Sequence, residues 1–143
     1  MIRLLTLAGL AIVAASPAVA DGDGDAAKGE IVFKKCMACH RIGPGAANAV
    51  GPVLTGVVGR KTGTAEGYSY SKLNLAVGAT GHIWTPEHIF AYLEDPNPYL
   101  KKVLTDAGKA DEAVGSTKMV FKLPDPTDRA DVIAYLKTFS PAK

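Results

Sequence analysis

The run Cys36–His40 reads Cys-Met-Ala-Cys-His and is the part of the chain most able to do chemistry. Two thiols separated by two residues, with a histidine directly after the second, form the attachment pattern of a c-type haem. Each thiol can add to one vinyl group, and the spacing lets both sulfurs reach one edge of the ring. His40 is then held beneath the iron, where its imidazole can be the proximal ligand.

Other kinds of site also use such a cysteine pair, and three alternatives stay open. A thioredoxin-like pair should follow a strand and open a helix in a βαβ unit, and no such pattern is visible. A structural zinc site needs four ligands, and the chain has only two cysteines and three histidines to offer. A disulfide across two residues closes too short a loop to stabilise a domain much. The histidine after the second cysteine favours covalent haem.

The ligand opposite His40 decides the function, because a closed six-coordinate haem transfers electrons and an open one binds gases or peroxide. Met119 is the methionine free to approach that face, since Met37 lies between the two cysteines. His82 and His88 would give bis-histidine ligation instead, but a structural role fits His82 and an exposed position fits His88. A thioether raises the reduction potential relative to a second histidine, so we expect a one-electron carrier of mid to high potential.

Residues 1–20 have the pattern of a cleaved secretory signal peptide. Arg3 gives a positive start, residues 4–15 are apolar, and residues 18–20 read Ala-Val-Ala before a polar run. An uncleaved membrane anchor is the alternative, although the apolar run is short for a bilayer. We expect export to a bacterial periplasm, with residues 21–143 forming one haem-binding domain.

The charge of the chain is nearly balanced, with 16 basic and 14 acidic residues. Nothing in that total suggests nucleic acid, so any electrostatic docking must come from a local patch. Seven lysines are candidates for such a patch around an exposed haem edge: Lys34, Lys35, Lys72, Lys101, Lys102, Lys118 and Lys122. An ordinary surface of mixed charge is the alternative.

Short helices and loops must position these residues, because no segment alternates as a strand would. Asp25 can cap a first helix over 25–35, and the glycine- and proline-containing run 41–65 is predicted to be loop. The run 68–75 is weakly helical.

Three later helices have clearer start signals. Thr85 and Pro86 begin a helix that ends at Asp95–Pro96, and Asn97–Pro98 begins a short one through Leu104. Asp125–Pro126 opens the last helix, whose apolar stripe recurs at helical spacing: Val132, Tyr135, Leu136 and Phe139. The predicted fold is therefore all-α, with short helices and loops wrapped around a covalent haem.

These features together resemble a class I cytochrome c, of the cytochrome c2 and mitochondrial cytochrome c type. The resemblance covers essentially all of residues 25–140. Besides Cys36–His40 it rests on stretches that are highly specific in this order: Val50-Gly51-Pro52, residues 59–63, residues 67–70, Trp84, residues 92–96, residues 117–121 and residues 130–136. The sequence departs from the family in one place. The segment from Pro96 to Met119 is longer than in short family members, and its polar part at 106–116 should be a surface excursion.

The resemblance implies roles for residues around the haem. His40 and Met119 would be the axial ligands, and the Pro52 carbonyl would accept a hydrogen bond from the other ring nitrogen of His40. Gly29 would let the first helix cross the last one near Tyr135. Three residues would neutralise or hydrogen-bond the propionates: Arg60, Tyr70 and Trp84. Four more would lie near Met119 or the haem edge: Asn74, Tyr92, Thr117 and Phe121. Ordinary core packing is the alternative for the aromatic residues.

The resemblance also implies a function. It would be that of a monomeric periplasmic carrier of single electrons, with a quinol-oxidising bc1-type complex as donor. Its acceptor would be a terminal oxidase or a photosynthetic reaction centre. The rival is a haem enzyme or gas sensor with an open sixth position, such as a small peroxidase. That rival needs a distal acid–base residue, and no histidine is well placed for the role.

Overall fold

The computed structural model describes residues 24–141, so the predicted signal peptide lies outside the described residues. Their secondary structure is helical: α1 (Ala26–Phe33), α2 (Lys72–Ala79), α3 (Pro86–Glu94), α4 (Pro96–Asp106), the 3₁₀-helix η1 (Ala110–Glu112) and α5 (Pro126–Lys137). Over 24–141 the β-structure amounts to one isolated bridge, between Lys61 and Ile83. The predicted all-α fold is therefore confirmed. No helix in this part of the chain is long and apolar enough to cross a membrane.

The helices begin where the sequence places capping residues. The Asp25 carboxylate accepts hydrogen bonds from the amides of residues 27 and 28, at 2.9 and 3.1 Å. Thr85 caps α3 through the amide of His88 at 3.2 Å, and Asp125 caps α5 in the same way as Asp25 caps α1. Each cap satisfies amides that the first helical turn leaves unpaired.

The helix predicted at 68–75 is wrong in position, because α2 begins four residues later. Ser71 has an extended backbone, and its hydroxyl accepts the amide of Asn74 at 3.2 Å, which fixes the helix start there. Tyr68 and Tyr70 instead lie in the loop after Gly67, with ring centroids 4.8 Å apart. α4 also begins one residue earlier than predicted and continues two residues beyond Leu104.

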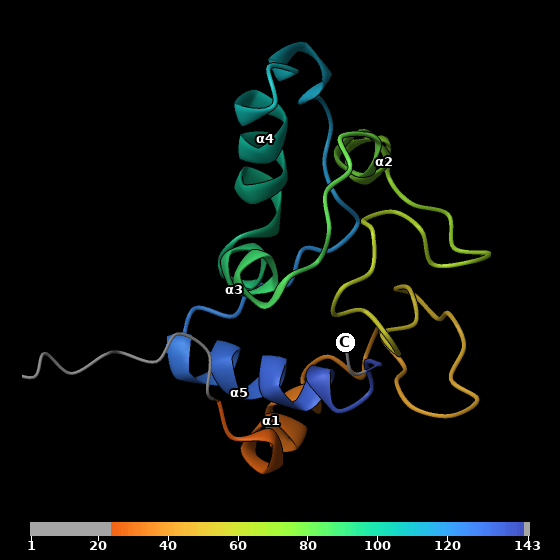
Figure 1. Cartoon of the computed structure of the whole chain (residues 1–143), viewed down its shortest axis with the longest axis vertical. Coiled ribbons are helices and arrows are strands. Elements are labelled where there is room, and N and C mark those ends of the chain that lie inside the picture. The colour runs from red at the N-terminus through yellow and green to blue at the C-terminus, as the bar shows by residue number, and fades with distance from the viewer. Residues whose placement is uncertain (1–23, 142–143) are drawn as a thin grey trace, which may run out of the picture.

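Helices α1 and α5 cross at one end of the molecule (Figure 1) and pack closely. Gly29 permits the crossing, because a Cβ there would overlap the carbonyl of Asp131 and lie 2.8 Å from the Cβ of Tyr135. The buried Asp131 carboxylate also accepts the amide of Asp25 at 2.7 Å. The predicted role of Gly29 is therefore confirmed.

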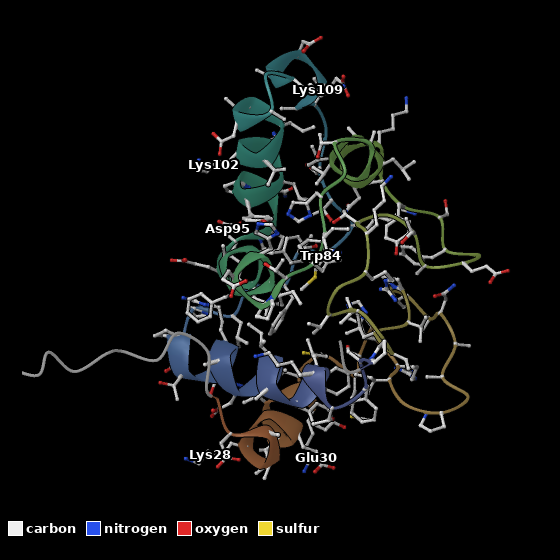
Figure 2. The ribbon with its side chains drawn as sticks, viewed as in Figure 1. Lys28, Glu30, Trp84, Asp95, Lys102 and Lys109 are labelled. Atoms are coloured by element: carbon white, nitrogen blue, oxygen red, sulfur yellow. The ribbon has the colours of Figure 1, made fainter. Side chains whose placement is uncertain are left out.

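Helix α3 packs against α5 and α4, and α4 leads away from this junction to η1 at the far end (Figure 1). The extra segment 106–116 forms the end of α4, a turn and η1, and most of its residues are exposed. Lys109 marks this tip in Figure 2. The surface excursion predicted for this segment is therefore confirmed.

Candidate haem site

A mainly apolar cavity of about 260 Å3 is lined by residues from α1, α2, α3, α5 and the loops between them. Every residue predicted to surround a haem lines it: Cys36, Cys39, His40, Pro52, Arg60, Tyr70, Asn74, Trp84, Tyr92, Thr117, Met119 and Phe121. Much of the remaining wall is aliphatic, from side chains such as Leu54, Ile89 and Leu136. Such a wall suits a large flat apolar group held by a few polar contacts.

The two cysteines reach the cavity from the turns that follow α1. The amides of Cys39 and His40 both donate to the carbonyl of Cys36, at 3.1 and 2.9 Å, so the whole motif occupies about one turn of chain. The two cysteines form no disulfide with each other. Burial raises the pKa of Cys36 to about 11, whereas a thioredoxin-like nucleophile has a lowered pKa. Over residues 24–141, no three potential ligands among His, Cys, Asp and Glu gather as a zinc site would require.

The His40 ring is oriented by its neighbours on the loop at 51–52. Its Nδ1 lies 2.7 Å from the Pro52 carbonyl, which can only accept, so Nδ1 carries the proton and Nε2 keeps its lone pair. Burial lowers the pKa of His40, although the Pro52 bond opposes the shift, so the ring is neutral at pH 7. Gly51 packs against the ring, since a Cβ there would lie 2.5 Å from Cε1. Nothing in the sequence pattern reveals this contact.

Met119 enters the cavity from the irregular segment that precedes α5. Its amide donates to the hydroxyl of Thr117 at 3.3 Å, and the Thr117 amide donates to Oδ1 of Asn97 at 2.8 Å. Burial raises the pKa of Tyr92 to about 12, against hydrogen bonds with Thr117 and Asn74 that lower it. Tyr92 is therefore a neutral hydrogen-bonding group in the cavity wall, and its partner Thr117 precedes Met119 by two residues. Asn97 has no motif that would identify it from the sequence.

Two polar groups in the wall have capacity for an acidic ligand group. Arg60 donates one Nη1 hydrogen to the Val53 carbonyl at 3.0 Å, but its buried Nε has no acceptor within the described part of the protein. The Tyr70 hydroxyl accepts the amide of Ala65 at 3.1 Å and keeps its own hydrogen to donate. A buried guanidinium N–H calls for an anionic partner. The residues present therefore fit haem, and Arg60 and Tyr70 are the groups that would hold its carboxylates.

Residues 26–140 match the family profile described as cytochrome c. The chain belongs to the cytochrome c family. It is 66% identical to cytochrome c2 iso-2 of Rhodospirillum centenum over 119 residues, which are 83% of this chain and 98% of the relative. Cytochrome c2 iso-1 of the same organism is 68% identical over 118 residues, 82% of this chain and 98% of the relative. The solved structure of cytochrome c2 from Rhodospirillum centenum superposes with a TM-score of 0.82, covering 82% of this chain and all of that one.

Membership in the family confirms haem c as the cofactor of this cytochrome c, bound covalently through the Cys36 and Cys39 pair, and one-electron transfer as its activity. The thiol–disulfide, zinc and enzymatic alternatives are thereby set aside. The individual roles of the other wall residues stay predictions.

Neither of the histidines considered as alternative ligands lines the cavity of this cytochrome c. His82 is buried, with Nδ1 2.7 Å from the Thr62 hydroxyl and Nε2 2.8 Å from the Tyr99 hydroxyl. The His88 ring stacks on His82 at 4.4 Å and bonds a backbone carbonyl, so the exposed position expected for it is wrong. The structural role predicted for His82 is confirmed, and its ring meets Trp84 edge-on at 5.0 Å.

The seven predicted docking lysines differ in their surroundings. Lys35 and Lys118 line the cavity, and Lys118 donates to the Ser69 carbonyl at 2.5 Å. Three form ion pairs: Lys35 with Asp128 at 2.8 Å, Lys102 with Asp106 at 2.5 Å, and Lys122 with Asp95 at 2.6 Å. Lys34, Lys72 and Lys101 pair with no carboxylate among residues 24–141. Figure 2 shows Lys102 on the side of α4 away from Trp84.

Proposed function

We propose that His40 and Met119 are the two axial ligands of this cytochrome c. The observation that carries the proposal is that both side chains line one mainly apolar cavity, and that His40 offers Nε2 while Nδ1 donates to Pro52. Bound haem supplies an iron that gains and loses one electron. The two cysteines hold its edge, the Pro52 carbonyl makes the His40 ring more basic, and aliphatic side chains exclude water.

The cavity opens where its lining residues are exposed. Val120 is 84% exposed and Val50 74%, although both line the cavity, and Phe121 also lines it and is exposed. Lys35 and Lys118 also line the cavity, so cationic groups accompany the apolar rim. We propose that this rim faces redox partners and that its lysines, with the others predicted above, attract acidic surfaces.

The proposed partners are a quinol-oxidising bc1-type complex as donor and a terminal oxidase or photosynthetic reaction centre as acceptor. The similarity to proteins named cytochrome c2 supports this choice. The signal-peptide pattern of residues 1–20 supports a periplasmic location. The nearly balanced charge gives no reason to expect a nucleic-acid partner.

Carbon monoxide added to the reduced protein tests the axial ligation. With Met119 on the iron, we expect the visible spectrum of the wild type to stay unchanged. The Met119→Ala variant should bind carbon monoxide at once and show a lower reduction potential, because a thioether ligand favours the ferrous state. A spectral shift in the wild type as large as in this variant would contradict the closed six-coordinate site.

A further inference from the structure

Met119 belongs to a segment that no helix or sheet supports. We call residues 115–122 the Met119 loop; it runs between η1 and α5 without regular structure. Within this loop, the backbone amides that find an acceptor among the described residues are those of Thr117 and Met119. Both acceptors are side-chain oxygens. The position of Met119 therefore depends on a few individual hydrogen bonds rather than on a ladder of backbone bonds.

The first of these bonds comes from Asn97. Its Oδ1 accepts the Thr117 amide at 2.8 Å, across 20 residues of sequence. Thr117 is 6% exposed, so water has little access to replace this acceptor. The Thr117 hydroxyl in turn accepts the Met119 amide at 3.3 Å. Asn97 thus fixes the residue that holds the backbone of Met119.

Asn97 itself stands on a rigid base. It lies in the first turn of α4 between Pro96 and Pro98, whose rings restrict the backbone on both sides. Pro96 is buried, and Leu100 and Leu104 anchor the following turns of α4 with no exposed surface. Loosening of the loop must therefore break the hydrogen bond rather than carry Asn97 along.

The other contacts near the ends of the Met119 loop are a backbone hydrogen bond and two exposed lysine contacts. At its far end the Leu123 amide donates to the Leu93 carbonyl at 2.7 Å, a backbone bond that substitution leaves in place. Lys118 and Lys122 reach acceptors at 2.5 and 2.6 Å, but both side chains are exposed. Exposed charged contacts contribute little to stability. Tyr92, which is partly buried, also bonds Thr117, but at the Thr117 side chain. Among the described residues, the Asn97 bond is therefore the shielded side-chain contact that holds the backbone of the Met119 loop from outside the loop.

We infer that Asn97 is a positioning residue for the sixth ligand, whose carboxamide oxygen keeps the Met119 loop closed and so sets how readily Met119 leaves the iron. The inference rests on the proposed ligation by Met119. Without Oδ1, the closed loop loses a bond to a buried amide, while the open loop, whose amide meets water, loses nothing. One such bond corresponds to a factor of roughly five to ten in the equilibrium between closed and open loop.

Imidazole binding to the ferric protein measures this equilibrium, because imidazole reaches the iron only when Met119 has left. We expect Asn97→Ala to bind imidazole roughly five- to tenfold more tightly than the wild type. Asn97→Asp keeps an acceptor oxygen and should stay close to the wild type. Thr105→Ala is the matched control, since Thr105 is exposed on α4 and its hydroxyl bonds only the Lys101 carbonyl.

Hydrogen exchange provides a second measurement. The Thr117 amide should exchange faster in Asn97→Ala, while the Leu123 amide should not change. If Asn97→Ala fails to hold its haem, Asn97→Ser is used in the experiment instead. Its side chain is polar but too short to reach Thr117. Wild-type imidazole affinity in both Asn97→Ala and Asn97→Ser would overturn the role of the Asn97 Oδ1. Equally tightened imidazole binding in Asn97→Asp and Asn97→Ala would overturn it too.

The two proposals fail in different ways. Ferric haem with a methionine ligand shows a weak red absorption band. If the wild type lacks this band, the ligation by Met119 is wrong whatever Asn97 does. If the wild type shows the band and removal of Asn97 leaves imidazole affinity unchanged, the ligation stands and the role of Asn97 is refuted.

Discussion

Replacing Gly51 by alanine would push a methyl group into the His40 ring. The new Cβ would lie 2.5 Å from Cε1 and 2.9 Å from Nδ1. Unstrained carbon contacts are about 3.5–4.0 Å, so either the His40 ring or the loop that carries Gly51 must move away by about 1 Å. The loop has little freedom to move, because the Gly51 amide donates to the Cys39 carbonyl at 2.8 Å and its carbonyl accepts the Ala49 amide at 2.9 Å.

The displacement should change both the reduction potential and the stability. Moving the ring lengthens the 2.7 Å bond from His40 to Pro52, and a hydrogen bond of this kind has a net worth of about 1 kcal/mol. That bond makes the imidazole more basic and so favours the ferric state. Its loss should raise the potential by up to about 40 mV, since a tenfold change in a one-electron equilibrium is about 59 mV. Overpacking should also cost about 1–3 kcal/mol of stability.

A redox titration and a thermal melt of Gly51→Ala test these values. Gly45→Ala is the control, because Gly45 lies in the preceding loop at φ +74° with nothing within 4 Å of a new Cβ. It should lose stability through backbone strain alone and keep the wild-type potential. The reasoning is refuted if Gly51→Ala has the potential and melting temperature of the wild type, or if Gly45→Ala shifts the potential equally.

Three further results are expected. Burial, with a smaller contribution from the charge of His88, lowers the pKa of His82 from 6.5 to about 4, so the unfolded state binds a proton first as pH falls. Stability should therefore drop between pH 6.5 and 4 by an amount on the order of 2–3 kcal/mol, and denaturant titrations of His82→Gln should show a flatter profile over that window. Neutralising Lys118, which lines the cavity, should slow reduction of an acidic partner at low salt more than neutralising Lys102 does. The effect of each substitution on the rate should vanish as salt screens the charges. A Cys36→Ser, Cys39→Ser chain without haem should be largely unfolded by circular dichroism, because its core would surround an apolar cavity of about 260 Å3; a native-like spectrum would contradict this.

The chemistry of the site could be predicted from the sequence where it depends on neighbours along the chain. The Cys36–His40 motif occupies about one turn, and the caps at Asp25, Thr85 and Asp125 act on amides two or three residues ahead. The error at 68–75 arose in the same range, since the cap at Ser71 outweighs the weak helical preference of the residues before it. Met119 could be predicted as the methionine free to reach the face opposite His40, whereas the other wall residues depend on the family resemblance rather than on local pattern.

Contacts between distant segments could not be predicted in the same way. Asn97 and Thr117 are 20 residues apart, and Gly51 meets His40 only after the loop folds back. The ion pairs of Lys35 and Lys122 bridge 93 and 27 residues, so a lysine count could not show which charges are already paired. Such contacts depend on tertiary packing, which neither propensity nor spacing encodes.

The two proposed axial ligands are held by contacts that span different distances along the chain, and this difference should decide which one leaves the iron first. His40 is tied to Pro52, 12 residues away, and to the turns that carry the cysteines. Met119 depends on the bond from the Thr117 amide to Asn97, 20 residues away, which is lost when the Met119 loop separates from α4. Segments with few backbone bonds open at lower free energy than the core.

The order of these events can be measured in a guanidinium titration. The red band of the methionine-ligated ferric haem should disappear at a lower guanidinium concentration than the far-UV helical signal, to which α1 and α5 contribute. In Asn97→Ala the two midpoints should move further apart, because only the first depends on the Thr117 bond. Coincident loss of both signals in the wild type would mean that the Met119 loop opens only with the whole fold, and that its separate attachment has no thermodynamic consequence.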